Sequence, residues 1–285
     1  MVSMLRRALI LGVRRSGYHI SACPELRAAH SMPDHLAKAL DYREMYPDLL
    51  PAPDITRRNH VRESLELGDM LKRRTALDIP EFYVGTYMSI TVSDKNAPGK
   101  KNKFVGICIQ RKDVGLRHQV VLRNIVENEG VEITYDLYSP LILEIQVLRL
   151  EKRLDKDLSF LRDALPEFST VPWNMEPEQH PEGSPVPINE TKAIMKGLPW
   201  TQRWERKELK GMIVPFELSE KRVRGAIETS KPWEKYDLMV DYRSQIPLEE
   251  QIVIWNQVEK HRRTVEERHK YIRRRKLMQS EELPV

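Results

Sequence analysis

Residues 104–140, which read FVGICIQRKDVGLRHQVVLRNIVENEGVEITYDLYSP, decide the fold of this chain. Apolar and polar residues alternate in short runs, as they do in β-strands, and turns rich in charge and glycine separate these runs. Basic side chains crowd the turns and strand ends, and no group of residues here is suited to carry out a reaction. A compact β-module with basic loops is better suited to bind a phosphate backbone than to transform a substrate.

The same pattern continues on both sides of this stretch. The predicted strands are residues 82–93, 105–111, 119–126, 131–137 and 143–148. The turn Asn128-Glu129-Gly130 is expected to join the third and fourth of these strands as a hairpin, with glycine at the tight position. Five short strands in so little sequence favour a small β-barrel over a sandwich.

Three helices are predicted outside the β-module. Residues from Thr56 to Thr75 have apolar side chains at roughly helical spacing, with Thr56 as the expected cap. Leucines spaced by four and three residues predict an amphipathic helix from Glu151 to Leu165 that packs against the barrel. A third, long helix is predicted from Leu248 to Met278.

Between the second and third helices the composition changes sharply. Residues from Asp163 to Glu190 include six prolines and six acidic residues but no lysine or arginine. A segment of this kind buries little and is typical of an extended linker. Beyond it, Trp200 and Trp204 are spaced to share one helical turn.

The overall composition limits the classes of protein that fit. The chain has 285 residues, a net charge of +5 and 19 prolines against 12 glycines. Its mean hydropathy is −0.54 and its pI is about 9.1. These values suit a modest core with long extensions and a polyanionic partner. Its two cysteines, Cys23 and Cys108, do not make a zinc site or a disulfide framework, and Cys108 is interpreted as a small buried strand residue.

The N-terminus has the pattern of a mitochondrial transit peptide. No acidic residue precedes Glu25, and four arginines alternate with apolar residues that form an amphipathic helical surface. Cleavage is expected between Arg15 and Ala29, and a frayed basic tail is the alternative interpretation. No apolar run approaches the roughly 20 residues that a membrane-spanning helix needs.

No catalytic, metal or cofactor site is predicted. Of the eight histidines, only His261 and His269 share a predicted helix, and their spacing of eight residues is wrong for joint metal ligation. Motifs of zinc proteases, P-loops, dinucleotide-binding folds and nucleophile elbows are absent from the sequence. We therefore expect neither a small-molecule substrate nor an enzyme.

Basic residues on adjacent loops of the predicted barrel are the candidate RNA contacts, because lysine supplies a point charge for phosphate and arginine binds it bidentately. Ordinary surface solvation is the alternative for any one of them. The candidates are Lys95, Lys100, Lys101, Lys103, Arg111, Lys112, Arg117, His118 and Arg123. Residues 260–276 add nine lysines and arginines against two glutamates, and suit RNA or an acidic partner better than a membrane, because their apolar face is sparse.

Several segments together resemble one known family. IPEFYVG at residues 79–85 is followed by FVGICIQR, GLRHQVVLRNI, GVEITYDLYSP and IQVLRLEKR, and their order and spacing resemble the nineteenth protein of the bacterial-type large ribosomal subunit (the L-nineteen family) over residues 79–153. RLDKDLSFLRDALPEFST and PWTQRWER resemble the animal mitochondrial form, which carries long extensions at both ends.

This resemblance implies an SH3-like barrel bound to large-subunit ribosomal RNA (rRNA), with Arg111, Arg117 and Arg123 at the family's RNA-facing basic positions. Acidic residues after the last predicted strand depart from the bacterial pattern and favour contact with a neighbouring protein there. These residues are Glu151, Asp155, Asp157 and Asp163. The expected function is that of a structural constituent of the mitochondrial large ribosomal subunit, in the matrix. A soluble mitochondrial RNA-binding or translation-regulating factor is the alternative.

The fold class expected from these observations is a mostly β core, namely a small SH3-like barrel, flanked by an N-terminal helix and long helical, partly irregular extensions. The extensions are expected to contact neighbouring mitochondrial ribosomal proteins. The predicted segments are a transit peptide (1–24), an N-terminal extension (25–78), the barrel (79–150), a packing helix (151–165), an acidic linker (166–190) and a C-terminal extension ending in a basic helix (191–285).

Overall fold

The computed structural model describes residues 44–53, 56, 58–181, 184–231, 233, 236, 237, 239 and 246–281. Side chains of the last helix are described as far as Arg275. The predicted transit peptide and Cys23 lie outside the described residues, so nothing here tests them.

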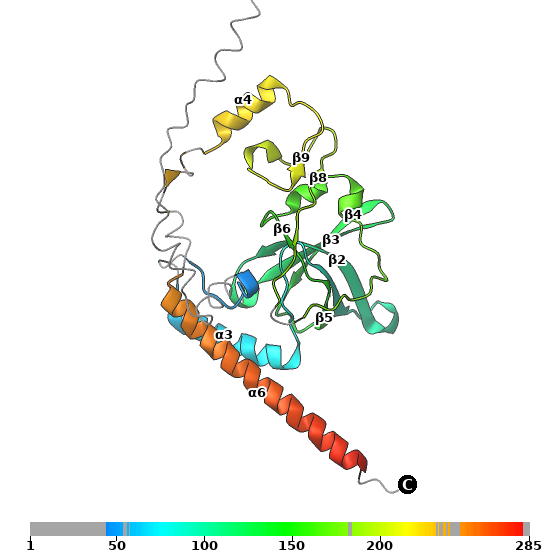
Figure 1. The fold of residues 1–285 in the computed structure, drawn as a ribbon, viewed down its shortest axis with the longest axis vertical. Coiled ribbons are helices and arrows are strands. Elements are labelled where there is room, and N and C mark those ends of the chain that lie inside the picture. Colours follow the sequence, from blue (N-terminus) through cyan, green and yellow to red (C-terminus); the bar gives the residue numbers. More distant parts are fainter. Residues whose placement is uncertain are drawn as a thin grey trace, which may run out of the picture.

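The core is a five-stranded antiparallel sheet, which confirms the prediction of a mostly β core (Figure 1). The strands are β1 (Tyr87–Ser93), β2 (Lys101–Lys112), β3 (Gln119–Val126), β4 (Glu129–Asp136) and β5 (Ile142–Arg149). Their order is β4-β3-β2-β1-β5, so β5 returns to pair with the first strand. In the described part of the chain β4 and β5 do not pair with each other, and the sheet therefore stays open instead of closing into the predicted barrel.

The hairpin between β3 and β4 turns one step earlier than predicted. Val126 pairs with Glu129, which leaves Glu127 and Asn128 as a two-residue turn, and both have positive φ angles, 51° and 68°. This is the geometry of a type I′ turn. Gly130 lies inside β4, where a Cβ atom would stand 2.8 Å from Nη2 of Arg123. The glycine there makes room for an arginine.

Two helices cover one face of the sheet. Helix α3 (His60–Ala76) begins at Asn59, whose side chain accepts hydrogen bonds from the amides of Val61 and Arg62, so the prediction of Thr56 as the cap is wrong. Helix α6 (Leu248–Glu281) confirms the predicted long helix. Its first half packs beside α3 and against the main hydrophobic cluster, and its second half extends beyond the rest of the fold (Figure 1).

The main hydrophobic cluster lies between the sheet and these helices. Met88, Ile90 and Leu122 from the strands are fully buried in it. Cys108 belongs to the same cluster, and burial raises the pKa of its thiol to about 12. The prediction of a small buried strand residue at this position is confirmed.

No helix forms from Glu151 to Leu165, so that prediction is wrong. The segment contains a short strand, β6 (Lys152–Arg153), and a 3₁₀ turn at Ser159–Arg162. Aspartates interrupt the helical pattern, because the Asp157 carboxylate accepts a hydrogen bond from the Ser159 amide at 2.9 Å, an arrangement that competes with helix. Leu158 and Leu161 are nevertheless buried, in a second hydrophobic cluster on the other face of the sheet.

The proline-rich segment after residue 163 packs closely only at its beginning, where Ser169 and Val171 are buried, whereas no described residue from 172 to 190 is buried, as the sequence predicted. Asn124 of β3 donates to the carbonyl of Val171 at 3.0 Å and accepts from its amide at 2.9 Å. Hydrogen bonds from side chains thus satisfy the N–H and C=O groups of an extended segment, whose prolines prevent regular secondary structure. Small elements follow, namely β7 (Ile188–Asn189), β8 (Ala193–Ile194), β9 (Met212–Ile213) and α4 (Glu220–Thr229), with β6 pairing β7 and β8 pairing β9 in parallel. Short 3₁₀ turns lie at Pro98–Lys100, Gly115–Arg117, Pro166–Phe168 and Trp204–Arg206.

The tryptophan pair does not share a helical turn. Only a 3₁₀ turn, Trp204–Arg206, forms in this region. Trp204 is 1% exposed within the second hydrophobic cluster, and Trp200 packs at the edge of that cluster with its indole nitrogen bonded to the Lys196 carbonyl at 2.8 Å. Trp204 therefore contributes to protein packing.

Candidate nucleic-acid interface

Four of the predicted RNA contacts lie on the hairpin between β1 and β2. Lys95, Lys100, Lys101 and Lys103 are all exposed, and β1 pairs with β2 as far as Ser93 opposite Lys101. Lys101 and Lys103 are two residues apart on one strand and therefore share a face. Within the described residues none of these four lysines has an ion pair, so their charge is available for an outside partner.

Lys112 and Arg117 are also exposed, but they lie at the other end of β2. At about 3.3 Å per residue, the length of β2 separates the two groups of cations by roughly 36 Å. The predicted clustering on adjacent loops is therefore wrong. The sheet presents two separate basic ends.

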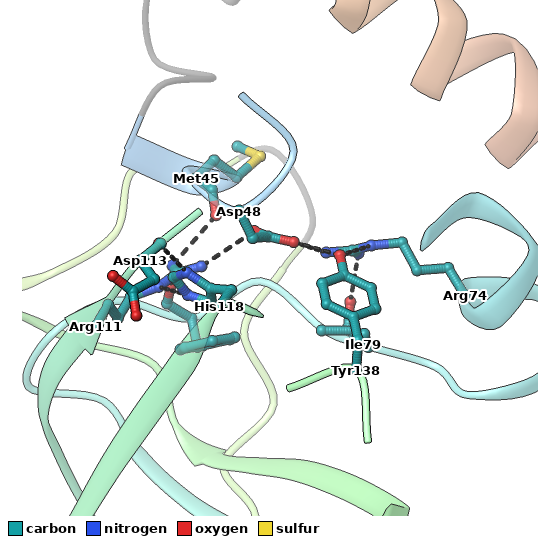
Figure 2. A network of polar contacts seen from close by, with 9 residues as sticks. Met45, Asp48, Arg74, Ile79, Arg111, Asp113, His118 and Tyr138 are labelled. Carbon is teal, nitrogen blue, oxygen red and sulfur yellow. Dashed lines mark hydrogen bonds and ion pairs between the residues drawn. The ribbon is translucent and has the colours of Figure 1, made fainter. Parts of the chain in front are cut away.

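Arg111 is buried and engaged by protein groups (Figure 2). Its Nη2 atom lies 3.2 Å from the carboxylate of Asp48, and its Nη1 atom donates to the Phe82 carbonyl at 2.8 Å. The guanidinium also stacks over the Phe82 ring, 4.1 Å from its centroid. This arginine fastens residues before α3 to the end of β2.

Asp48 is the centre of this network. Its carboxylate is fully buried and also accepts hydrogen bonds from Arg74 of α3, at 2.8 Å, and from the hydroxyl of Tyr138. Burial alone would raise the pKa of Asp48, but the charges of Arg74 and Arg111 outweigh burial and lower this pKa to about 2. The carboxylate is therefore ionised and paired with two arginines.

His118 belongs to the same network and is 1% exposed. Its Nε2 atom accepts a hydrogen bond from Nε of Arg111 at 3.1 Å, so Nδ1 carries the proton and donates to the Asp113 carbonyl at 2.8 Å. Burial, and then the charge of Arg111, lower the pKa of His118. The neutral imidazole orients Arg111 and does not face an outside ligand.

Arg123 is also an internal residue. It is 7% exposed, pairs with Glu132 of β4 at 2.7 Å and donates to the hydroxyl of Ser169 at 3.3 Å. The same glutamate also pairs with Arg162 at 2.7 Å. Arg123 thus joins β3 and β4 to the segment around Ser169.

The structure therefore divides the nine candidates. Arg111, His118 and Arg123 are held by protein partners. These partners account for their polar groups, so the clustering of basic residues in the sequence is no longer a reason to assign these three to RNA. RNA contact by the six exposed cations remains a prediction. The sequence did contain a sign of this internal role, because Arg111 and Arg123 each follow an apolar strand run, in ICIQR and VVLR. A cation in such a position signals a buried pair, because buried charges require partners.

Substituting the two arginines separately will distinguish these roles. We expect Arg123→Gln to reduce the free energy of unfolding by about 2 kcal/mol, because hydrogen bonds to charged groups are lost while Glu132 keeps Arg162. Arg117→Gln should change it by no more than about 0.5 kcal/mol, as is usual at exposed positions. Urea unfolding measures both. Equal stability of the two variants would contradict the internal role of Arg123.

The acidic residues after β5 also have internal partners. Asp155 accepts hydrogen bonds from the amides of Lys210 and Gly211, at 2.9 and 2.7 Å, and Asp163 accepts from Thr201 and Trp204. Glu151 is 4% exposed and accepts from Asn189. These carboxylates hold the C-terminal segment on the sheet, and contact of this part of the chain with a neighbouring protein remains a prediction.

The remaining surface offers little for catalysis. A hollow of about 460 Å³ is lined mainly by cations, and its lining residues are Arg203, Ser219, Lys221, Arg222, Arg224, Gly225 and Glu228. The described residues contain no cluster of histidine, cysteine and carboxylate side chains suited to a metal ion. Among the described helices, none is long and apolar enough to cross a membrane.

Comparisons with known proteins decide the family. The family model for Ribosomal protein L19 matches residues 66–170, from the middle of α3 to just beyond the 3₁₀ turn at Pro166–Phe168. The "Large ribosomal subunit protein bL19m" of Drosophila melanogaster is 52% identical over 219 residues, which are 76% of this chain and 72% of the fly protein. The chain belongs to the ribosomal protein L19 family. The resemblance read from the sequence is confirmed.

Two plant members of the L19 family match a smaller part. The "Large ribosomal subunit protein bL19c" of Spinacia oleracea is 34% identical over 92 residues, covering 32% of this chain and 40% of the plant protein. The "Large ribosomal subunit protein bL19cy" of Arabidopsis thaliana is 31% identical over 96 residues, covering 34% of this chain and 42% of the plant protein. The similarity to the fly protein extends much further along this L19-family chain than the similarity to either plant protein.

Proposed function

We propose that this chain is a structural constituent of the mitochondrial large ribosomal subunit, located in the matrix, where it binds large-subunit rRNA and neighbouring ribosomal proteins. The observation that carries the proposal is its 52% identity, over 76% of the chain, to a fly protein named as the mitochondrial form of the family. The match to the fly protein is about twice as long as the match to the family model, so it extends well beyond the part of the chain that the model covers.

The basic ends of the sheet support RNA binding. Six exposed cations lie at the two ends of β2, and none has an ion pair within the described residues. Lysines of this kind gain affinity for RNA by releasing counterions from phosphates. We propose no catalytic activity, because membership of a structural ribosomal family supports a binding role. The pairing of β5 with β1 and the bulges in β5 and β2, which bend and twist strands, support a barrel-like curvature of the open sheet.

Sedimentation tests the main proposal. The tagged full chain, expressed in cells, should co-migrate with the mitochondrial large subunit in a sucrose gradient and remain with it in moderate salt. A regulatory factor that binds transiently would leave the large-subunit fractions as the salt concentration rises. Recovery of the chain only at the top of the gradient would reject the structural role.

The hairpin lysines provide a more specific prediction. Changing Lys95, Lys100, Lys101 and Lys103 to glutamine should lower the slope of log K against log salt for large-subunit rRNA by about 3, if each lysine contacts one phosphate. The matched control changes Lys72, Lys192, Lys196 and Lys210, which are exposed lysines on other segments, to glutamine. It has the same net charge. An equal slope for both variants would show that the hairpin is not a specific RNA contact.

A further inference from the structure

Helix α6 consists of two halves with different surroundings. Its first half is fixed to the fold: Glu250 pairs with Arg58, His261 lies 3.3 Å from the hydroxyl of Thr75 on α3, and Trp255 packs on the main hydrophobic cluster. Its second half, from Arg268 to Arg275, is exposed throughout and extends away from the sheet (Figure 1). The helix therefore holds an anchored base and a projecting arm.

The two halves also differ in how their cations are neutralised. In the first half, Glu259 pairs with Arg262 at 3.0 Å and Arg263 at 3.1 Å, and Glu266 pairs with Arg262 at 2.9 Å. In the arm no residue is acidic, and its cations have no ion pair within the described residues. These cations are Arg268, Lys270, Arg273, Arg274 and Arg275.

This charge density opposes an isolated helix. Lys270 lies three and four residues before Arg273 and Arg274, spacings at which like charges destabilise a helix by about 0.2 to 0.5 kcal/mol per pair. At 1.5 Å per residue, five charges are carried on about 11 Å of helix, or one in roughly 2 Å. Duplex nucleic acid carries one phosphate charge in about 1.7 Å of axis, so the two densities match.

The directions of the cations narrow the choice of partner. At about 100° per residue, the five cations spread over roughly 220° of the helix circumference. The remaining face holds only His269 and Ile272, and Tyr271 projects among the cations with 65% of its surface exposed. A helix that lies on a membrane needs a broad face of large apolar residues, which this arm lacks. Single surface ion pairs with an acidic protein would contribute little each.

We propose that residues 268–275 form an RNA-binding arm that inserts between phosphate backbones of the large-subunit rRNA, with Tyr271 placed to stack on an unpaired base. The inference rests on the proposed function and adds a third RNA contact to the two basic ends of the sheet. Phosphates on two or more sides neutralise cations that spread over more than half of the circumference. Counterion release then makes the arm a strong contributor to salt-dependent affinity.

A matched pair of variants on the same helix tests the arm. Arg274→Gln with Arg275→Gln should lower the log–log salt slope for binding the large-subunit rRNA transcript by about 1.5. Arg262→Gln with Arg263→Gln removes the same charge from residues already paired with Glu259, and should lower the slope by less than half as much. Glutamine is a good helix former, and circular dichroism of each full-length variant checks that the helix persists.

The outcomes separate the inference from the proposed function. If the arm variant and its control change the slope equally, or neither does, while the hairpin variant lowers it, the RNA-binding arm is rejected and the proposed function stands. If no variant lowers the slope, RNA binding by the chain is rejected as well. If the arm variant keeps its rRNA slope but is lost from assembled subunits, the arm binds an acidic protein and the inference is overturned. Charge-dependent binding to phosphatidylcholine–cardiolipin vesicles with an unchanged rRNA slope would overturn it also.

Discussion

Replacing Asp48 by alanine is expected to destabilise the chain by about 3 to 5 kcal/mol. The substitution leaves two buried guanidinium groups, those of Arg74 and Arg111, without their shared carboxylate, and removing one partner of a buried ion network costs about this much. It also removes the acceptor for the Tyr138 hydroxyl. Because Asp48 joins the residues before α3 to α3 and the end of β2, the loss should appear as a lower urea midpoint of the whole fold.

The pH dependence supplies an independent measurement on the same residue. The pKa of Asp48 is about 2 in the folded chain and near 3.8 for an ordinary aspartate. A carboxylate with a lowered folded pKa contributes stability above pH 4 and loses it as the pH falls from about 4 to 2, a contribution of about 2 kcal/mol. His118, with its lowered pKa, starts the decline earlier, because the unfolded chain takes up that proton first.

Asp78→Ala is the control for this prediction. Asp78 is an exposed aspartate close to the same helix, and its replacement should leave the urea midpoint within experimental error. Between pH 4 and 2, the Asp48→Ala variant should lose less stability than the unmodified chain. Equal acid sensitivity of the two would show that Asp48 is not ionised and paired as its geometry indicates.

The strands could be predicted because their signal is local. Val120 and Leu122 point to the same side of β3 and are buried there, and the predicted bounds of this strand, 119–126, coincide with those observed. The long α6 was predictable for a similar reason, because no proline interrupts its sequence after residue 247. Alternation and uninterrupted helical sequence are properties of neighbouring residues, so they survive any tertiary arrangement.

The internal networks could not be predicted, because their partners are distant in sequence. Arg111 meets Asp48 across 63 positions, and Asn124 meets Val171 across 47. Charge counting treats all arginines as surface groups, and so it placed Arg111 and Arg123 beside Arg117. Likewise, the leucine spacing near Leu158 correctly indicated burial. Leu158 and Leu161 are buried in the second hydrophobic cluster, however, without forming an α-helix.

Asp163→Ala is the second substitution with a large expected effect, because this residue fixes the predicted linker to the sheet. One oxygen of its carboxylate accepts hydrogen bonds from the amide and hydroxyl of Thr201, at 2.9 and 2.7 Å, and from the indole nitrogen of Trp204. Removing the carboxylate leaves these three donors unsatisfied, one of them, the Trp204 indole, in a buried setting, at a cost of about 3 kcal/mol. Trp204 should become more exposed, shifting its fluorescence to longer wavelength.

Asp163→Asn distinguishes hydrogen bonding from charge. All three donors converge on one oxygen, so an asparagine that places its carbonyl there keeps the three bonds and should lose only about 1 kcal/mol. Exposed Glu167, on the neighbouring turn, is the control, and its change to alanine should leave the midpoint unmoved. An unchanged midpoint and fluorescence in Asp163→Ala would mean that residues after 163 are the independent linker that their composition suggests. A loss in alanine that asparagine largely restores would mean that this segment folds as one cooperative unit with the β-sheet.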